Sequence, residues 1–409
     1  MKRFLKTLSI VLVSLLLFTC KKQDVSTEQS QMFVKYYGGA LGDNHGYDVK
    51  QTADGGYIIA GTVKVGDNNT DAVLIKTDAM GNQVWMKNFG SSSNDNDEGK
   101  NVQLLPNGGF VMCGTYGGTK TDMLLVIADA NGNGSTHQIG YKIYNEVANT
   151  IKVNPDGDFL LLGSTVSIAS SKKPYMVKVK PDGSVRWSFT QYGSSSGSGD
   201  DVGNCLTISS DSSTFFVVST STTFSPLGGT DISILMFYAD KDVQPVQATP
   251  AVFGSGVDDV ASASQILSDA SWIVVGSQGV DIYLCNFYDR TPTFTPTIDI
   301  VPNGAWPKNF GATGASQTVG NSVQATADGG YIVLGTALRG ANYDQYLTKR
   351  DANGNMVWEF FLGGLDEKDE GGAVIQTSDG GYAVVGTTEY KSSSMISLIK
   401  VTSEGKLQK

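Results

Sequence analysis

The stretch that decides the fold is DGGYIIAGT at residues 54–62, because close copies of it recur near the end of the chain. These copies are DGGYIVLGT at 328–336 and DGGYAVVGT at 379–387. Four weaker copies are NGGFVMCGT from Asn107, DGDFLLLGS from Asp156, DSSTFFVVST from Asp211 and DASWIVVGS from Asp269. The seven anchors lie 49 to 59 residues apart, a period that suits four short strands with their turns.

The composition favours an all-β chain. Among 409 residues there are 49 glycines, and hydrophobic residues make up 40% while charged residues make up 17%. This is too apolar for a disordered chain and too rich in turns for a helical one. With 40 acidic against 30 basic side chains the net charge is −10, which argues against sequence-independent nucleic-acid binding.

Each repeat predicts one blade of a propeller. In the first repeat we expect strands near 47–52, 57–62, 72–78 and 84–89, joined by hairpin turns that include DGG and DAMGN. The second strand is apolar on both faces, as expected for a strand between two neighbouring blades. The sequence therefore predicts a seven-bladed β-propeller of four-stranded antiparallel blades.

The two ends of the chain are expected to complete one blade together. The last repeat reaches a third strand near 396–402, and residues 406–409 are too few for an outer strand. The segment FVKYYGG at 33–39 matches the outer-strand signatures WMKNFG at 85–90, WPKNFG at 306–311 and WEFFLG at 358–363, with Phe33 in the tryptophan column. Residues 33–409 then form a single domain that leaves no open sheet edge.

The first 20 residues, MKRFLKTLSIVLVSLLLFTC, predict export. Three basic residues precede an apolar run that is too short to span a bilayer, so 1–19 read as a signal peptide. LFTC resembles the lipobox of bacterial lipoproteins, which implies lipidation at Cys20 and a tether over 20–32. A plain secretory leader is the alternative. Cys113, Cys205 and Cys285 lie in apolar strands and are expected to be buried free thiols.

Taken together, the repeats resemble the DGGY-type seven-bladed propellers of secreted bacterial lipoproteins, a group that implies a fold and no particular activity. The segments DAMGNQVW, DANGNMVW and KPDGSVRW also resemble the turn-and-tryptophan signature of quinoprotein-like propellers, including outer-membrane assembly lipoproteins. This second resemblance covers three repeats.

Two sets of residues are candidates for a ligand site on the loops around the channel mouth. The first is an acid column ten residues before the repeat anchors, formed by Asp97, Glu146, Asp201, Asp259 and Asp369. A ring of these carboxylates could bind calcium or a polyhydroxyl ligand, and the alternative is that each caps backbone N–H groups of its own loop. The second set consists of aromatic residues in the loops after the second strands: Tyr116, Phe224, Tyr343 and Tyr390.

Evidence for catalysis is thin, because only His45 and His137 are present and no catalytic motif appears. We expect an exported, lipid-anchored binding or scaffold propeller, a monomer without a resident cofactor, whose ligand is a glycan or a protein. Its expected place is the cell envelope, at the periplasmic or surface side of the outer membrane. The alternatives are a quinoprotein-like or glycan-cleaving enzyme and an outer-membrane assembly scaffold.

Overall fold

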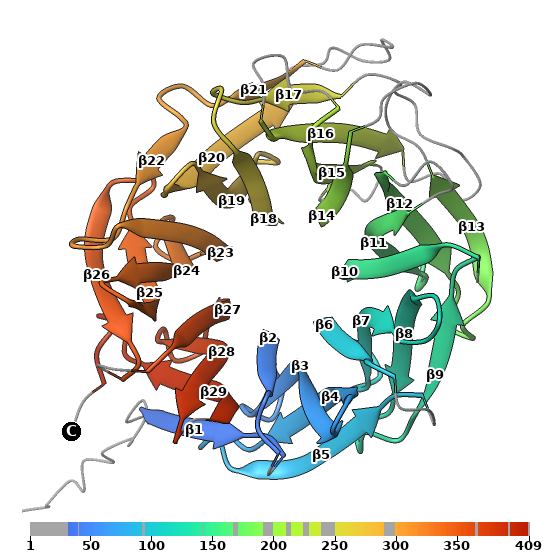
Figure 1. Ribbon diagram of the computed structural model, residues 1–409. Coiled ribbons are helices and arrows are strands. Elements are labelled where there is room, and N and C mark those ends of the chain that lie inside the picture. Colours follow the sequence, from blue (N-terminus) through green and yellow to red (C-terminus); the bar gives the residue numbers. More distant parts are fainter. Residues whose placement is uncertain are drawn as a thin grey trace, which may run out of the picture.

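The structure is a ring of seven antiparallel sheets around a central axis (Figure 1). The computed structural model describes residues 32–39, 41–91, 95–141, 143–166, 171–190, 199–209, 214–223, 229–238, 250–289, 299–364, 367–391 and 393–407. Every regular element within these ranges is a strand. The predicted seven-bladed β-propeller is confirmed.

Each blade runs from an inner strand beside the axis to an outer strand at the rim. Blade 1 consists of β2 (His45–Gln51), β3 (Tyr57–Gly66), β4 (Asn69–Thr77) and β5 (Gln83–Phe89). Blade 2 consists of β6 (Glu98–Leu104), β7 (Phe110–Tyr116), β8 (Asp122–Ala128) and β9 (Gly134–Ile139). Blade 3 consists of β10 (Asn145–Val153), β11 (Phe159–Val166), β12 (Lys172–Val179) and β13 (Val185–Thr190). Blade 4 consists of β14 (Asp201–Ile208), β15 (Thr214–Ser221), β16 (Asp231–Tyr238) and β17 (Ala251–Phe253).

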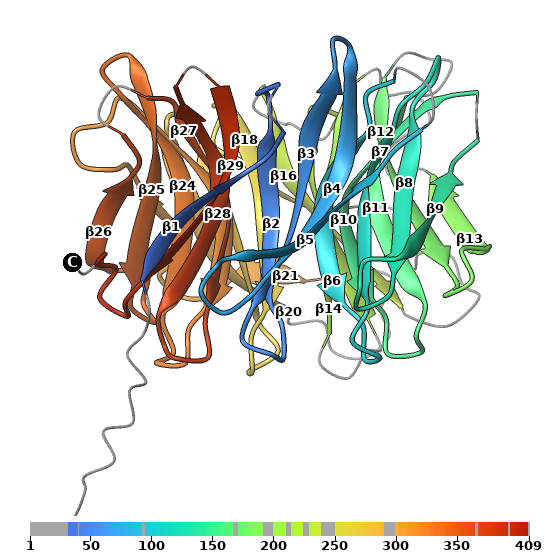
Figure 2. The ribbon, with the colours of Figure 1, turned by 90° about the horizontal axis from the view of Figure 1, so that it is seen from below.

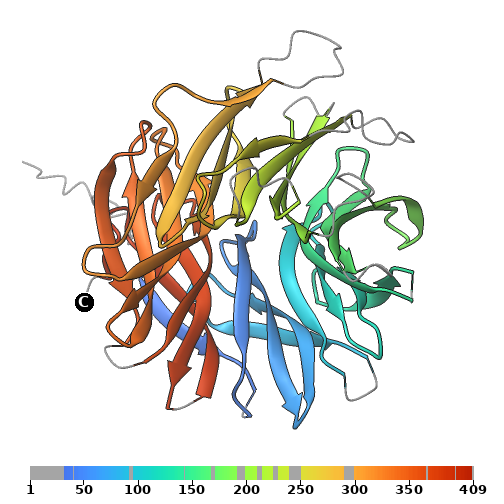
Figure 3. The ribbon, with the colours of Figure 1, turned by 45° about the horizontal axis from the view of Figure 1, so that its top comes forward.

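The remaining blades follow the same order. Blade 5 consists of β18 (Asp259–Ile266), β19 (Trp272–Gln278), β20 (Asp281–Asp289), β21 (Ile300–Pro302) and β22 (Lys308–Phe310). Blade 6 consists of β23 (Gln317–Ala325), β24 (Tyr331–Arg339), β25 (Asn342–Arg350) and β26 (Met356–Leu362). Blade 7 consists of β27 (Asp369–Gln376), β28 (Tyr382–Tyr390), β29 (Ser393–Val401) and β1 (Phe33–Tyr37). Figure 3 shows the blades standing around the axis in an oblique view.

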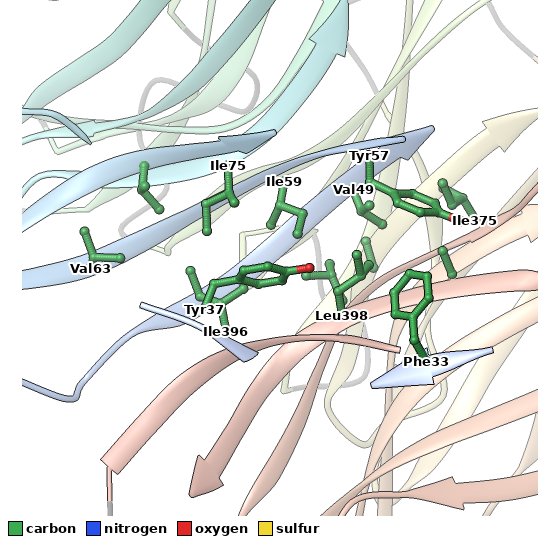
Figure 4. Packing of buried hydrophobic residues seen from close by; sticks show 14 residues of the cluster. Phe33, Tyr37, Val49, Tyr57, Ile59, Val63, Ile75, Ile375, Ile396 and Leu398 are labelled. Carbon is green, nitrogen blue, oxygen red and sulfur yellow. The ribbon is translucent and has the colours of Figure 1, made fainter. Parts of the chain in front are cut away.

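Blade 7 is closed by the first strand of the chain, as predicted. Strand β1 pairs antiparallel with β29, so that Phe33 lies opposite Lys400, and the side view of Figure 2 shows the two strands next to each other. The buried ring of Phe33 meets Tyr57 of blade 1 edge to face, with 6.1 Å between ring centroids. Tyr37 donates a hydrogen bond from its hydroxyl to the carbonyl of Gly81, 2.6 Å away. Figure 4 shows the rings of Phe33 and Tyr37 in one cluster with residues of blades 1 and 7.

The aromatic residue of the DGGY motif explains why the repeats form a ring. Each such ring is buried. At several seams it meets an aromatic residue from the outer strand of the preceding blade, or from the segment that leads into that strand. The observed pairs are Phe33 with Tyr57, Trp85 with Phe110, Trp306 with Tyr331 and Trp358 with Tyr382, all at centroid distances near 6 Å. Large aromatic surfaces dominate the burial energy of such contacts. The tryptophan column and the DGGY column are therefore the two halves of one contact between blades.

The two glycines of the DGG turn have different tasks. Gly55 has φ of +80°, a conformation in which a side chain is strained. A Cβ atom on Gly56 would collide with the carbonyl oxygen of Thr77 and would lie 2.7 Å from Lys76 Nζ. The first glycine permits the turn, and the second lets the third strand approach.

Blade 5 departs from the pattern at its rim, because two short strands share the place of one outer strand. Strand β21 pairs with the end of β20, while β22 pairs with its beginning. The peptide bond between Trp306 and Pro307, which lies between them, is cis. Residues 290–298 lie outside the described ranges.

The signal peptide predicted for 1–19, the lipidation site Cys20 and nearly all of the tether also lie outside the described residues. In the part of the chain that the structure describes, no helix is long and apolar enough to cross a membrane. Cys113, Cys205 and Cys285 are free and buried, as expected.

Candidate functional site

The five acids of the predicted column are all buried, and none of them lines the central channel. Each lies at or next to the start of an inner strand, below the loop that arrives from the previous blade. The five are Asp97, Glu146, Asp201, Asp259 and Asp369. The structure therefore places them at the seams between blades, one at each of five seams.

Several of these carboxylates accept hydrogen bonds from the backbone of the connecting loops. Asp97 accepts the N–H of Ser91 and the N–H of Gly117, each at 2.7 Å. Asp259 accepts the N–H of Ser255 at 2.8 Å. Such bonds satisfy buried donors that would otherwise lack a partner. Asp97 thus joins the loop that enters blade 2 to the loop between the second and third strands of that blade, and Asp259 holds the loop that enters blade 5.

Asp201 is held by a cation as well as by hydroxyl groups. Lys173 Nζ lies 2.8 Å from Asp201 Oδ2, and Thr223 Oγ1 lies 2.7 Å from the same oxygen. The side chains of Asp201 and Lys173 are 2% and 15% exposed, so this ion pair is largely shielded from water. Its geometry leaves little room for an external ligand.

Glu146 lies against a second carboxyl group. A Cβ atom on Gly140 would collide with Asp122 Oδ1 and approach Glu146 Oε2, which shows that both carboxyls converge below this glycine. Burial, together with the neighbouring Asp122, raises the pKa of Glu146 to about 7. At the seam of blades 6 and 7, burial raises the pKa of Asp369 to about 6. Both acids are harder to ionise than a solvated carboxyl group.

Within the described ranges, no three His, Cys, Asp or Glu side chains come together in a group that could hold a metal ion. The acid column is thus not gathered at one point of the channel mouth. Its role in ligand or calcium binding remains a prediction, and its observed contacts are those of loop caps.

The predicted aromatic residues are dispersed over separate blades. Tyr390 is 42% exposed and stacks on Tyr36 at a centroid distance of 5.4 Å. The ring of Tyr343 is half-buried and lies 5.4 Å from Lys368 Nζ. Tyr116 packs against the core shared by blades 1 and 2. Phe224 lies outside the described residues.

The channel itself offers a better candidate site. A cavity of about 320 Å³ lies on the axis and is lined by residues from all seven inner strands, which Figure 1 shows around the centre. We call this space the channel cavity. Its volume is at the lower end of the range of small-molecule sites, roughly 300–1,000 Å³.

A β-bulge in every inner strand supplies the lining. In each blade the pairing between the first and second strands shifts by one residue, directly after the small residue that packs on the neighbouring blade. A bulge leaves one residue unpaired and redirects its side chain. We call the seven unpaired residues the bulge column. All of them line the channel cavity: Tyr47, Lys100, Asn149, Asn204, Ser262, Asn321 and Gly372. The ring therefore presents mostly amide, hydroxyl and ammonium groups to the axis.

Charge is distributed unevenly in the channel cavity. Blades 1 to 3 contribute Lys50, Lys100, Lys152 and the carboxylate Asp48, whereas the lining residues that the structure describes in blades 4 to 7 are uncharged. Lys50 Nζ lies 2.6 Å from Asp48 Oδ1. Lys100 Nζ lies 3.1 Å from Glu98 Oε2 and 3.9 Å from the ring centroid of Tyr47. The arc formed by blades 1 to 3 is thus the charged side of the channel.

A second cavity of about 530 Å³ lies at the seam of blades 5 and 6, below the divided outer strand. Its lining includes Trp306, Tyr331 and the buried amide of Asn286. Only this seam contributes to it, so it does not use the sevenfold arrangement of the inner strands.

Sequence reasoning missed the bulge column, although a signal for it was present. Small residues stand eight positions before each of the seven anchors, and the next position is polar or charged in six of the seven repeats. The polar position after each small residue is difficult to interpret without the pairing register of the first and second strands. In a strand without a bulge, these side chains would point away from the axis.

Comparison with known proteins finds only distant similarity to solved structures. No family profile and no curated protein matches this sequence. Among solved structures, an α-L-arabinanase from Penicillium chrysogenum is 10% identical with a TM-score of 0.48, covering 92% of this chain and 99% of its own. The β-propeller domain of the Trilobed protease from Pyrococcus furiosus is 10% identical with a TM-score of 0.46, covering 89% and 99%. A glucose dehydrogenase is 12% identical with a TM-score of 0.46, covering 74% and 95%. At this level of similarity none of their activities transfers to this chain.

Proposed function

We propose that this chain is an exported, lipid-anchored binding protein that holds a short glycan in its channel cavity, and that it is one of the DGGY-type lipoprotein propellers it resembles. The observation that carries the binding role is the bulge column, which places a ring of polar side chains around one axial cavity. A glycan presents many hydroxyl groups, and these pair with amide and hydroxyl side chains. β-Bulges often lie next to functional sites, where they redirect a side chain, and here a bulge recurs in every blade.

Two amides of the ring are fixed in advance by the fold. Asn149 donates from Nδ2 to the carbonyl of Gly203 at 2.9 Å, and Asn204 donates from Nδ2 to the carbonyl of Ala261 at 2.5 Å. Neither Oδ1 atom accepts a hydrogen bond from the described residues. Acceptors that are already oriented lose little entropy when a ligand hydroxyl binds to them.

The lining also favours binding over cleavage. Glycoside hydrolysis commonly uses two carboxyl groups on opposite sides of the bond. Among the described residues that line the channel cavity, Asp48 is the single carboxylate. It accepts hydrogen bonds from Val49 N, Lys50 Nζ, Asn101 Nδ2 and Val102 N, so both of its oxygens are occupied. We infer that Asp48 holds Lys50 and Asn101 in place on the charged side of the channel, which is formed by blades 1 to 3.

The binding role is tested by obstructing the channel. Ser262 is a half-buried bulge residue of the lining, and Ser262→Trp would fill the axial space. Ser135→Trp, on the exposed rim strand β9, is the matched control. The full chain is titrated calorimetrically with neutral and acidic oligosaccharides. We expect Ser262→Trp to weaken binding at least about tenfold and Ser135→Trp to leave it unchanged. Equal effects of the two variants, or no binding of any glycan, would contradict the proposal.

The anchor is tested separately by Cys20→Ser. Without the thiol no lipid can be attached, and a single exported soluble protein should replace the membrane-bound form. Fractionation after a salt wash measures this. A variant that stays in the membrane fraction would show that Cys20 does not carry the anchor.

A further inference from the structure

Lys152 is the exception among the charged groups of the channel cavity. Lys50 is paired with Asp48, and Lys100 is paired with Glu98. Lys152 Nζ, in contrast, makes no hydrogen bond and no ion pair with the described residues. It projects from inner strand β10 of blade 3 and is only partly accessible to water.

The surroundings of Lys152 make its charge costly. Burial lowers the pKa of Lys152, and the positive charge of Lys50 in blade 1 lowers that pKa further. Asp48 and the Cys205 thiol of the adjacent blade raise the pKa of Lys152 and so compensate in part for this lowering. A half-buried ammonium group without a partner is unfavourable for stability, and an anion that entered the cavity would relieve the cost. Such groups are found more often at binding sites than in a neutral scaffold.

The rest of the lining limits what this anion can be. Among the described residues, blades 4 to 7 supply amides, hydroxyls and apolar groups without charge, so the cavity as a whole accepts one negative group and several neutral polar ones. The lysines and Asp48 leave a modest positive excess at the axis of a protein whose net charge is −10. A long polyanion would be repelled by the molecule, whereas one carboxylate on a short polyhydroxyl ligand fits both conditions.

We propose that the channel cavity selects an acidic glycan, and that Lys152 binds the carboxylate of a uronic acid residue while the bulge amides bind its hydroxyl groups. This inference rests on the proposed glycan-binding function and names the class of glycan. Selectivity arises because a neutral sugar leaves the ammonium unpaired, while a uronate pairs with it.

The test compares sugars that differ only in the charged group. The full chain is titrated with di- and trisaccharides that carry a single galacturonate residue and with the neutral galactose oligomers of the same linkage and length. We expect the acidic oligomers to bind at least about tenfold more tightly, and this preference to decrease as salt is added. The same titrations are repeated with Lys152→Met, Lys152→Arg and the control Lys87→Met, since Lys87 is exposed on the outer strand β5.

Lys152→Met should remove the preference for the acid and leave the affinity for the neutral oligomers unchanged. Lys152→Arg should keep most of the preference, and Lys87→Met should keep all of it. The melting temperature of Lys152→Met should equal or exceed that of the natural protein, because an unpaired cation is lost. If neutral and acidic oligomers bind equally, or if Lys152→Met behaves like Lys87→Met, the selectivity is refuted while channel binding stands. If no oligomer of this series binds, the preference for a uronic acid is refuted, and the wider set of oligosaccharides titrated against Ser262→Trp decides the glycan-binding role.

Discussion

Lys76 Nζ lies 2.8 Å from Asp54 Oδ2, so the acid of the DGG turn is bound to a lysine on the third strand of the same blade. The lysine side chain is 9% exposed and the carboxylate 63% exposed. Equivalent pairs recur in three other blades: Asp156 with Lys178, Asp328 with Lys349 and Asp379 with Lys400. In blades 2 and 5 the strand register places the uncharged residues Ile127 and Asn286 at the position that this lysine occupies in the other blades. The repeated aspartate thus neutralises a buried ammonium group.

This pair predicts unequal effects of its two substitutions. Asp54→Asn removes the counter-ion of a buried lysine and should cost about 1–3 kcal/mol of unfolding free energy. Lys76→Met replaces the ammonium with an apolar group of similar length and should cost less. The double variant should resemble Lys76→Met alone, and thermal unfolding of all four proteins measures this. Additive losses would show that the two side chains act independently.

A second prediction concerns the closure of the ring. Phe33 is 9% exposed and meets Tyr57, whereas Tyr36 on the same strand is 43% exposed. Phe33→Ala should cost about 3 kcal/mol because it opens the seam between blades 7 and 1. Tyr36→Ala is the matched control and should cost less than about 1 kcal/mol. Removal of residues 1–40 should lower the melting temperature more than removal of residues 1–30. Equal melting of the two truncated proteins would refute closure by β1.

The raised pKa of Glu146 predicts a pH dependence. The folded protein retains a proton on this group up to about pH 7, whereas the unfolded chain, with a pKa near 4.5, releases it earlier. Because the folded state binds more protons between these values, stability should fall as the pH rises from 5 to 8. Glu146→Gln should reduce that fall in melting temperature.

The control for this series is Glu404→Gln. The pKa of Glu404 is lowered by a hydrogen bond from Ser403, so its carboxyl is ionised throughout the range from pH 5 to 8. Melting curves of the three proteins at intervals across this range give the comparison. Parallel curves for Glu146→Gln and the natural protein would show that the proton is not held at Glu146.

A fourth prediction separates loop capping from calcium binding in the acid column. Asp259→Asn should cost on the order of 1 kcal/mol because it weakens hydrogen bonds to a connecting loop. Asp201→Asn should cost about 1–3 kcal/mol because it also removes the counter-ion of the shielded Lys173. The losses should be nearly additive, since the two acids lie at different seams. Calcium should leave all melting temperatures unchanged. A calcium-dependent rise that disappears in the double variant would instead identify a cation site.

Much of the fold could be predicted from single columns of the repeat. Phe33 occupies the tryptophan column, and this was sufficient to predict that β1 completes blade 7 because the same aromatic position recurs in the outer-strand segments of other repeats. The DGG turns gave the blade positions since glycine is required there. The seven blades and the closure of the ring by β1 could therefore be predicted from the sequence alone.

The site could not be predicted in the same way. Tyr47 follows Gly46 in a bulge, and a shift of one residue decides whether its side chain faces the axis or the next blade. The partner of Glu146, Asp122, lies on the third strand of another blade, so no local pattern shows that the two carboxyls meet. Strand register and contacts between blades depend on residues that are far apart in the sequence. An alignment of the seven repeats does not show them.

The pairing of Phe33 with Lys400 also has a consequence for the order of events during folding. A chain leaves the ribosome from its N-terminus, so β1 is made first and its partner β29 almost last. Six blades can hydrogen-bond internally as they appear, while β1 keeps an unpaired edge until synthesis is nearly finished. Contacts between distant parts of a sequence form slowly. Strand β1 therefore stays unpaired until β29 becomes available, and the ring closes late in folding.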